Sequence, residues 1–153
     1  MKMLSLISFT KEGLEKVKEE KRLLLLKRPQ AVDELRIARE MGDLSENAAY
    51  HVARAKLSQT DSRLRHLDNL IRRAHIHNPP IQGTVGLGSK VKLQNRDKAF
   101  EYQIVGSFEA DPAQGKISHI SPLGRLLMGK KIGDEVSVKT SSSLNPYKIL
   151  NIS

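Results

Sequence analysis

Two series of apolar positions, mirror images about residue 44, constrain the fold of this chain more than any other feature. The first series occupies positions 14, 17, 21, 24, 28, 31, 35 and 38, and the second occupies 50, 53, 57, 60, 64, 67, 71 and 74. Six of the eight positions in the first series are apolar, as are seven of the eight in the second. Spacing of three and four residues is typical of coiled-coil seams. The mirror relation therefore predicts an antiparallel helical hairpin that bends between Gly42 and Glu46.

The second half of the chain has a different character, which begins at Asn78-Pro79-Pro80. Eight of the ten glycines and five of the six prolines lie from residue 79 on. Apolar residues there alternate, as in strands with one buried face: Val91 and Leu93; Phe100, Tyr102 and Ile104; Val136 and Val138; Tyr147 and Ile149. Ser121 and Pro122 are typical of a helix start, and Gly129 of a stop, which predicts a short helix from Pro122 to Met128. We therefore expect an α+β protein: a coiled-coil hairpin over residues 1–78 and a small antiparallel β domain with one short helix over 79–153.

Composition narrows the class of protein and of partner. The chain has no cysteine, so disulfides and thiolate metal sites are excluded. Its longest apolar run, Leu23 to Leu26, is far from the ~20 residues that span a bilayer, and we expect a cytoplasmic protein with no membrane partner. The net charge of +9 favours an acidic partner, such as nucleic acid or an acidic protein surface. A solvated surface that happens to be basic explains the charge equally well.

The predicted bend carries two carboxylates, Asp43 and Glu46, directly after Gly42. Their spacing is that of a capping box, in which Asp43 accepts from the backbone at position 46 and Glu46 reaches back to Asp43. The same pair, exposed on one turn, can instead share a divalent cation. Mg²⁺ is usually held by one or two carboxylates with other oxygen ligands, so a partner would have to complete the shell. Spacing alone favours the capping box.

Two basic residues, Arg39 and Arg54, flank the bend on the two predicted helices. Basic groups beside paired carboxylates suit a phosphodiester target, although ordinary helix-surface arginines are the simpler interpretation. The five histidines form no metal-binding pattern, and His75 and His77 are expected at a helix end.

The bend and the second half together resemble one family. The tip of the Gre transcript-cleavage factors of bacterial RNA polymerase, most of all of the GreA type, is resembled by the run from Ala38 to His51. This run reads AREMGDLSENAAYH. Further segments resemble the C-terminal domain of that family: Gln103 to Gly106, Glu109 to Asp111, Gly115 to Ser118, Ser121 to Arg125, Gly129-Lys130 and Gly133-Asp134. The resemblance covers nearly the whole chain, with both domains in order.

The resemblance implies a function that spacing and composition do not. The coiled coil would enter the secondary channel of backtracked RNA polymerase, where Asp43 and Glu46 help hold the second catalytic Mg²⁺ and position the attacking water. The ion would be shared with the polymerase and not bound tightly by this chain alone. The polymerase would then cut its own transcript, so this chain is a cofactor and not itself an enzyme. Arg39 and Arg54 would contact the extruded 3′ end of the nascent RNA.

The same resemblance assigns supporting residues. Gly42, Ser45, Asn47 and Tyr50 would shape the tip, with Ser45 helping to orient the acids. The C-terminal domain would be FKBP-like and would dock at the channel mouth through residues that include Ser121, Pro122, Gly124, Arg125 and Lys130. We expect a monomer. Ala49 replaces an acid found in many members, which should change the charge of the tip without loss of function.

Two other functions remain open. The first is a basic coiled-coil module that binds nucleic acid or RNA polymerase without catalysis. The second is a remnant prolyl isomerase, suggested by an FKBP-like fold. An isomerase pocket is normally lined by aromatic residues, and the predicted β domain has only Phe100, Tyr102, Phe108 and Tyr147, which argues against it.

Overall fold

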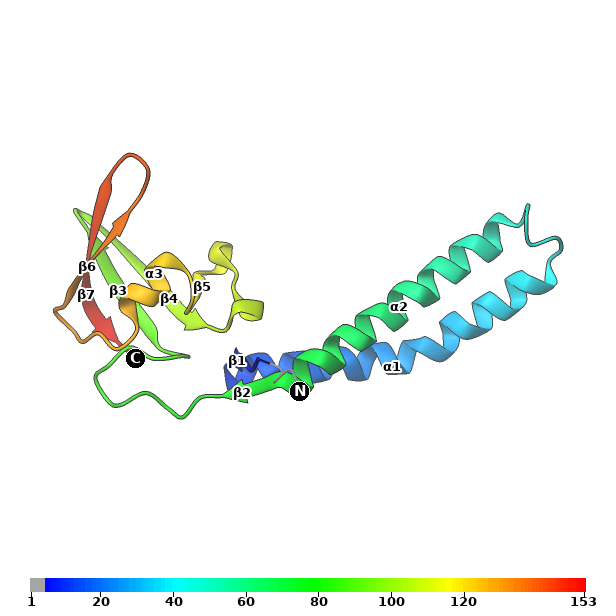
Figure 1. Ribbon diagram of the computed structural model, residues 1–153, viewed down its shortest axis with the longest axis horizontal. Coiled ribbons are helices and arrows are strands. Elements are labelled where there is room, and N and C mark those ends of the chain that lie inside the picture. Colours follow the sequence, from blue (N-terminus) through cyan, green and yellow to red (C-terminus); the bar gives the residue numbers. More distant parts are fainter. Residues whose placement is uncertain (1–4) are drawn as a thin grey trace. The chain divides into compact units, whose positions relative to one another are not determined.

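A computed structural model of the protein describes residues 5–153. Two long antiparallel helices, α1 (Lys11–Glu40) and α2 (Ala48–Arg73), form the hairpin predicted from the sequence, with residue 44 at the centre of the bend (Figure 1). The hydroxyl of Thr10 caps α1 by accepting a hydrogen bond from the backbone N–H of Gly13 at 3.0 Å. Pro29 lies inside α1 without ending it.

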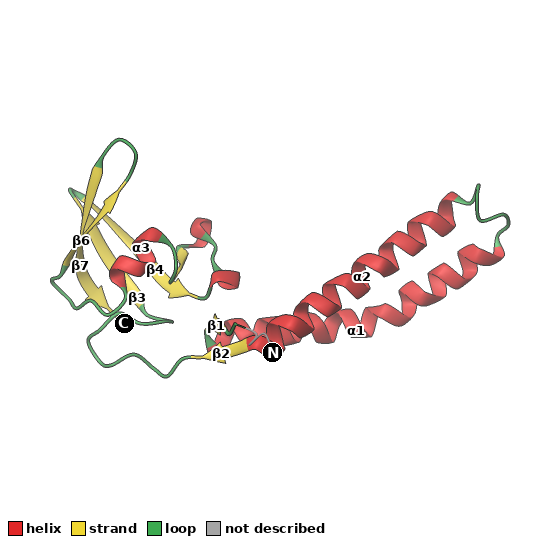
Figure 2. Ribbon diagram, in the orientation of Figure 1, coloured by secondary structure: helices red, strands yellow, loops and turns green. Residues whose placement is uncertain are grey.

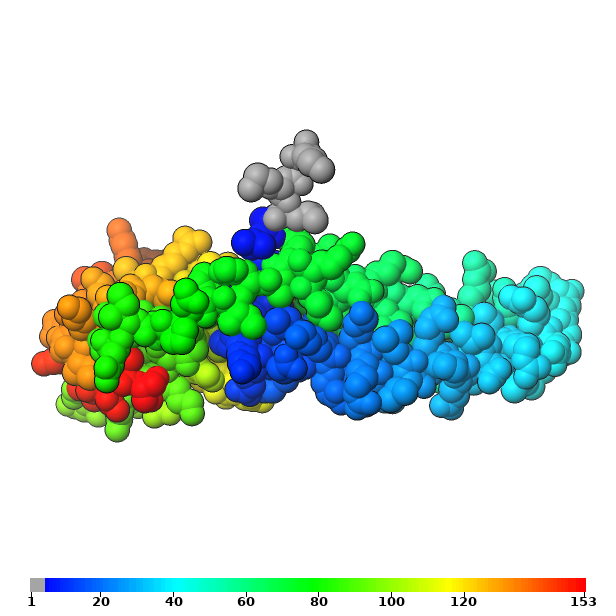
Figure 3. Space-filling model, turned by 90° about the horizontal axis from the view of Figure 1, so that it is seen from below, coloured from blue at the N-terminus to red at the C-terminus, as the bar shows by residue number. Residues whose placement is uncertain are grey.

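The two apolar series face each other, as their mirror spacing predicts. All sixteen positions are buried or half-buried, whereas most residues between them are exposed. Leu67 is fully buried, and Ala31, Ala38, Ala53 and Leu64 are buried as well. In the space-filling view, where α1 is blue to cyan and α2 is green, the two helices run alongside each other (Figure 3). The hairpin is therefore held by one narrow apolar stripe along its length.

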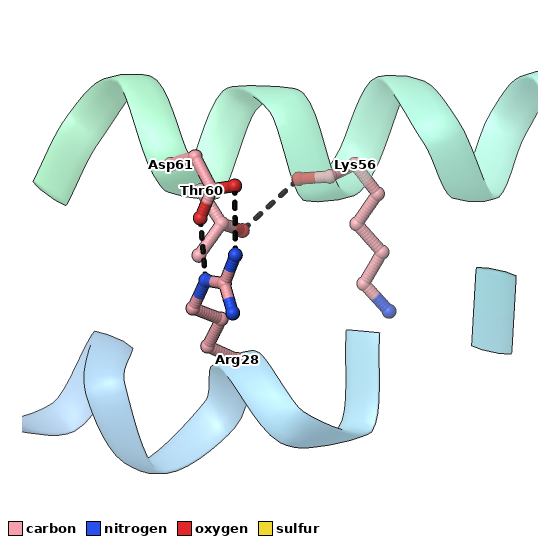
Figure 4. A network of polar contacts seen from close by, with 4 residues as sticks. All are labelled: Arg28, Lys56, Thr60 and Asp61. Carbon is pink, nitrogen blue, oxygen red and sulfur yellow. Dashed lines mark hydrogen bonds and ion pairs between the residues drawn. The ribbon is translucent and has the colours of Figure 1, made fainter. Parts of the chain in front are cut away.

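Arg28 places a charged side chain within this apolar stripe, and the carboxylate of an acidic residue on α2 neutralises its charge. Its guanidinium donates two hydrogen bonds to the carboxylate of Asp61, at 2.6 Å from Nε and 3.0 Å from Nη2 (Figure 4). The seam register places Arg28 opposite Thr60, but the Thr60 hydroxyl turns back to donate to the carbonyl of Lys56 on its own helix. The contact with Arg28 also lowers the pKa of the Asp61 carboxyl below its usual value. A forked ion pair of this kind favours one alignment of the two helices.

Three further ion pairs cross between α1 and α2 along the edges of the stripe. They are Lys21 with Asp68 at 2.7 Å, Arg63 with Glu20 at 2.6 Å, and Lys56 with Glu34 at 2.6 Å. All of them are partly solvated, so each adds little to stability. Together they disfavour a shifted register, because a slip of one residue would separate every pair.

The second half forms a five-stranded sheet in the order β5-β4-β3-β7-β6 (Figure 2). The strands are β3 (Lys90–Asn95), β4 (Lys98–Val105), β5 (Lys116–Ser118), β6 (Glu135–Lys139) and β7 (Leu144–Ile152). All four predicted alternating segments lie on these strands. The sheet is mixed, not antiparallel as predicted, because β5 pairs with β4 in parallel. Two short 3₁₀ helices, η1 (Ser107–Glu109) and η2 (Pro112–Gln114), form the crossover that a parallel pair requires.

The core of this sheet lies under the one α-helix of the second half, α3 (Pro122–Leu127). Its buried members are Val85, Val91, Leu93, Ile104, Leu127, Val136 and Ile149. Leu127 is fully buried and Leu123 packs against the core, whereas Leu126 and Met128 remain exposed. The helix ends one residue before the predicted Met128, which is its C-cap.

A small parallel sheet at the base of the hairpin was not predicted. It pairs β1 (Ile7–Phe9) with β2 (Ala74–Ile76), so Ala74 and His75 lie on a strand and not at the helix end expected from the sequence. The described residues form two compact units. One is Leu14–Arg73, and the other joins the residues up to Gly13 with those from Ala74 on. The division therefore differs from the boundary at residue 78 that composition predicted.

The carboxylate of Glu109 ties the start of α1 to the sheet domain. It accepts hydrogen bonds from the backbone N–H of Thr10 at 2.8 Å, from the Thr10 hydroxyl, and from the backbone N–H of Gly106 at 3.2 Å. A side chain at Gly13 would collide with this carboxylate. Glycine at position 13 therefore leaves room for the Glu109 contact at the cost of some helix propensity.

Candidate functional site

The turn between α1 and α2, residues 41–47, is the candidate site, and its chain reversal depends on glycine. Gly42 has φ of 140°, in the region that L side chains rarely adopt. Apart from Gly42 and its two chain neighbours, no atom of the described residues lies within 4 Å of where its Cβ would be. Backbone conformation, and not crowding, therefore explains glycine at this position.

Asp43 is fastened by a local turn and not by a capping box. Its Oδ1 accepts hydrogen bonds from the backbone N–H of Ser45 at 3.0 Å and from the Ser45 hydroxyl at 2.9 Å. These bonds, the backbone bond first, lower the pKa of the Asp43 carboxyl below its usual value. Within the described part of the chain, Oδ2 has no hydrogen-bond partner. Asp43 is thus an exposed, ionised carboxylate with one oxygen anchored and one free.

The cap of α2 is Asn47, which corrects the predicted roles of Asp43 and Glu46. The side-chain Oδ1 of Asn47 accepts from the backbone N–H of Tyr50 at 3.0 Å, because the helix begins at Ala48 and not at position 44. Its Nδ2 donates to the carbonyl of Ala38 at 2.6 Å. Asn47 thereby joins the end of α1 to the start of α2. The asparagine directly before a helical run is the sequence signal from which this cap could have been predicted.

Because Asn47 caps the helix, Glu46 is released from a structural role. Its side chain is exposed and, across residues 5–153, has no hydrogen bond or ion pair. Asp43 and Glu46 are therefore two solvent-facing carboxylates on one short turn. The residues that the structure describes gather no group of three or more side chains able to hold a metal ion, so a complete metal site at the tip requires ligands from elsewhere.

Replacing Asn47 with alanine should destabilise the tip through both of its bonds. The change removes the cap acceptor for the Tyr50 N–H and the donor to the Ala38 carbonyl, and we expect a loss of about 1–2 kcal/mol. Thermal unfolding followed by circular dichroism measures it. Asn47→Asp is the matched control, since it keeps the cap acceptor and should cost less. Equal melting temperatures for wild type and Asn47→Ala would contradict the capping role.

The predicted basic pair lies on either side of this turn. Arg39 is in the last turn of α1, and Arg54 is on α2; both are exposed, and neither has an ion-pair partner among the described residues. Arg36 differs, since it contacts Asp33 at 3.7 Å and Glu40 at 3.3 Å. Arg39 also suits the negative end of the helix dipole, so a structural role coexists with any contact to phosphate. Near them the Tyr50 ring lies half-buried, 5.6 Å from the ring of His51.

The predicted docking residues of the second domain divide into two kinds. Ser121 caps α3 by accepting from the N–H of Gly124 at 3.0 Å, and its hydroxyl donates to the carbonyl of Ser118 at 2.7 Å. Gly124 is buried where any Cβ would collide with that same carbonyl. Pro122 occupies the first helical position. These three residues have structural explanations, whereas Arg125 and Lys130 present exposed side chains.

Comparison with protein families matches both halves of the chain. Residues 7–76 match the model of the transcription elongation factor N-terminal domain. Residues 80–153 match the model of the GreA/GreB transcription elongation factor C-terminal domain. The chain belongs to the GreA/GreB family of transcription elongation factors. The resemblance identified from the tip and C-terminal motifs is confirmed.

Curated relatives of this GreA/GreB family member extend over nearly its full length and indicate the GreA type. Transcription elongation factor GreA of Mycoplasma capricolum is 44% identical over 149 residues, covering 94% of each chain. The GreA factor of Thermodesulfovibrio yellowstonii is 41% identical over 152 residues, covering 96% of each chain. The GreA factor of Nitratiruptor is 41% identical over 147 residues, covering 94% of this chain and 90% of the relative.

Solved structures of the family also align with this GreA/GreB chain. The transcription factor Gfh1 aligns with a TM-score of 0.48 and 25% identity, over 98% of this chain and 99% of Gfh1. GreA/GreB from Nitrosomonas europaea aligns with a TM-score of 0.44 and 21% identity, over 96% of this chain and 98% of the Nitrosomonas chain.

In residues 5–153, no helix is long and apolar enough to cross a membrane.

Proposed function

We propose that this GreA/GreB family member binds bacterial RNA polymerase, inserts the α1–α2 tip into the secondary channel and stimulates cleavage of backtracked RNA. The observation that supports the proposal is that both acids of the tip are exposed carboxylates that do not cap α2. Asp43 is held ionised by Ser45, and Glu46 has no partner of its own in the described part of the chain. Neither acid is used as a cap of α2, whereas Asp61 is held in an ion pair and Glu109 accepts backbone hydrogen bonds.

The chemistry of the tip fits a magnesium ion shared with the polymerase. Carboxylate oxygens are the ligands that Mg²⁺ prefers, and the ion usually keeps several positions for water and phosphate. The free Oδ2 of Asp43 and the carboxylate of Glu46 supply two such ligands. When bound, Mg²⁺ supplies an activated water and neutralises charge that develops on the phosphate. Because the chain offers only half of a site, it acts as a cofactor of the hydrolysis and not as an enzyme alone.

The flanking arginines give the tip a contact for RNA. Arg39 and Arg54 are unpaired within residues 5–153 and exposed, so their guanidiniums are available to phosphate oxygens. Arg39 lies in the last turn of α1, four residues before Asp43, and Arg54 lies on α2, eight residues after Glu46. In this scheme they hold the extruded 3′ end of the transcript. Arg125 and Lys130 are the exposed residues of the second domain proposed to dock on the polymerase.

A second candidate function follows from the net charge of +9: a basic module that binds nucleic acid without catalysis. The two functions separate in a single assay. The protein is added to RNA polymerase complexes stalled in a backtracked state, and release of 3′ RNA fragments is followed with and without it. Faster release supports the cleavage factor. Salt-sensitive binding to duplex DNA with no release supports the module.

The substitution Ser45→Ala tests whether the Ser45 hydroxyl helps to lower the pKa of the Asp43 carboxyl. The change removes the hydroxyl bond to Oδ1 but keeps the backbone bond, so the pKa of the Asp43 carboxyl should rise toward its usual value. Because the pKa of the Asp43 carboxyl is lower in the folded protein than in the unfolded chain, its ionised form stabilises the fold at pH values above the unfolded-state pKa. That contribution to the free energy of unfolding is lost as the pH falls through the folded-state pKa. NMR titration of the Asp43 carboxyl measures the shift, with Ser58→Ala on α2 as control. An unchanged pKa in Ser45→Ala would show that the hydroxyl does not tune the acid.

A further inference from the structure

The first turn of α2 carries an aromatic pair to which the proposed cleavage scheme gives no direct part. Tyr50 and His51 are neighbours in the sequence, and their rings lie edge to face, with centroids 5.6 Å apart and planes at 64°. Tyr50 is half-buried at a seam position, whereas His51 is exposed. Within residues 5–153, the imidazole of His51 makes no hydrogen bond or ion pair. Packing on Tyr50 therefore accounts for where the ring lies, and both of its nitrogens stay open to a partner.

The backbone beneath this ring is held by several hydrogen bonds. The N–H of Tyr50 donates to the side chain of Asn47 at 3.0 Å, and the N–H of His51 donates to the carbonyl of Asn47 at 3.2 Å. Asn47 in turn donates to the carbonyl of Ala38 on α1 at 2.6 Å. A contact made by a side chain on a rigid support loses little conformational entropy when it forms. His51 is therefore well placed to bind a partner with its ring.

The direction of the helix brings this ring toward the tip. Side chains of an α-helix incline toward its N-terminus, and the N-terminus of α2 is the end that meets the turn with Asp43 and Glu46. His51 is the fourth residue of α2, and Arg54 lies three residues further along. Residues three apart are neighbours on a helix surface. An exposed ring and an exposed guanidinium thus lie side by side on α2, and both incline toward the acidic turn.

This combination of groups matches the parts of an unpaired nucleotide. Bases of single-stranded RNA stack on aromatic side chains, histidine included. A guanidinium binds phosphate oxygens, and exposed carboxylates suit a metal ion that a phosphate oxygen also contacts. A duplex would offer phosphates to Arg54 but no free base to His51, because its bases are stacked on one another. The ring therefore favours a single strand as the partner of this face.

We propose that His51 stacks on an unpaired base near the 3′ end of the transcript and so helps to position the phosphodiester that is cut. This inference rests on the proposed function and adds a substrate-binding residue to it. Stacking tolerates any sequence, since every base has a π-face. Such a contact suits a factor that acts on transcripts of any sequence. His51 transfers no proton in this role.

Substitutions of His51 test the stack in backtracked polymerase complexes at saturating protein. His51→Ala should slow stimulated cleavage about tenfold, a loss within the range expected for one base–aromatic stack. His51→Phe should restore the rate because it keeps a flat ring. His51→Gln should resemble His51→Ala, because it keeps a polar group and loses the ring. Affinity for polymerase should be unchanged in all three, and His66→Ala, at another exposed histidine of α2, should cleave like the wild type.

RNA that lacks one base tests the partner of the ring. Complexes are assembled on synthetic RNA in which an abasic ribose replaces each unpaired 3′ nucleotide in turn. At one position the wild type should fall to the rate of His51→Ala. The abasic RNA and the His51→Ala protein together should then be no slower than either alone, because both changes remove the same contact.

Three results would overturn the inference while leaving the proposed function intact. One is stimulation by His51→Ala at the wild-type rate. Another is a loss in His51→Phe with normal cleavage in His51→Gln, which would assign the ring a polar role. The third is losses that add at every abasic position, which would show that the ring contacts no base. Failure of the wild type to stimulate cleavage at all would instead refute the proposed function, and the inference with it.

Discussion

Asp43→Asn combined with Glu46→Gln should reduce stimulated transcript cleavage by about a hundredfold or more, a loss of roughly 2.7 kcal/mol of transition-state stabilisation. The side chains keep their size, and the amide of Asn can still accept from Ser45. Binding to polymerase should survive, because the change leaves the hairpin and the second domain intact. The measurements are cleavage rates in backtracked complexes and, separately, affinity for polymerase.

Asp33→Asn with Glu40→Gln is the matched control for this experiment. It makes the same change in charge on α1, at two exposed acids that contact Arg36. Normal cleavage in the control would assign the loss to the tip and not to net charge. Cleavage that persists in the tip variant would refute the catalytic role of the two acids.

Leu64→Asp should destabilise the hairpin by about 3–5 kcal/mol, the largest effect on stability that we expect. Leu64 is 8% exposed and lies in the stripe between the helices. A carboxylate there has to be buried without a partner or must open the helix pair. Because a two-helix arm buries only one stripe, little else in residues 14–73 offsets the loss. Helical circular dichroism during thermal unfolding measures it.

Leu26→Asp provides the control, since the same chemical change is made on α1 at a leucine that is 65% exposed. Its effect should stay within about 0.5 kcal/mol. A Leu64→Asp protein that melts like the wild type would refute the seam register. Similar losses for both variants would show that charge, and not burial, is responsible.

The main architecture was predictable because it rests on periodicity. Mirror spacing about residue 44 located the hairpin, since helix pairing depends on a repeat that is visible in the chain itself. Alternation located β3, β4, β6 and β7 for the same reason. The pairing of β1 with β2 was not predictable, because strands of three residues have too short a pattern to recognise. The parallel placement of β5 depends on the crossover through η1 and η2, which carries no periodic signal.

The sequence correctly placed Asp43 and Glu46 on the bend of the hairpin, but it mispredicted the hydrogen bonds around them. Asp43 and Glu46 fit a capping box by spacing, but Asn47 lies nearer to the helix start and takes the cap. The error strengthens the functional interpretation, because it removes the structural role that competed for Glu46. Ser121 and Gly124 show the opposite outcome: candidates for docking have structural roles at the start of α3.

The magnesium dependence of cleavage tests the proposed shared metal site most directly. RNA cleavage by backtracked polymerase is measured across a range of Mg²⁺ concentrations, alone, with the wild-type protein, and with the Asp43→Asn, Glu46→Gln variant. If the tip supplies ligands to the ion, the wild type should lower the Mg²⁺ concentration for half-maximal cleavage, and the variant should leave it where polymerase alone has it. Stimulation by the wild type with no shift in that concentration, or an equal shift by the variant, would contradict coordination by Asp43 and Glu46.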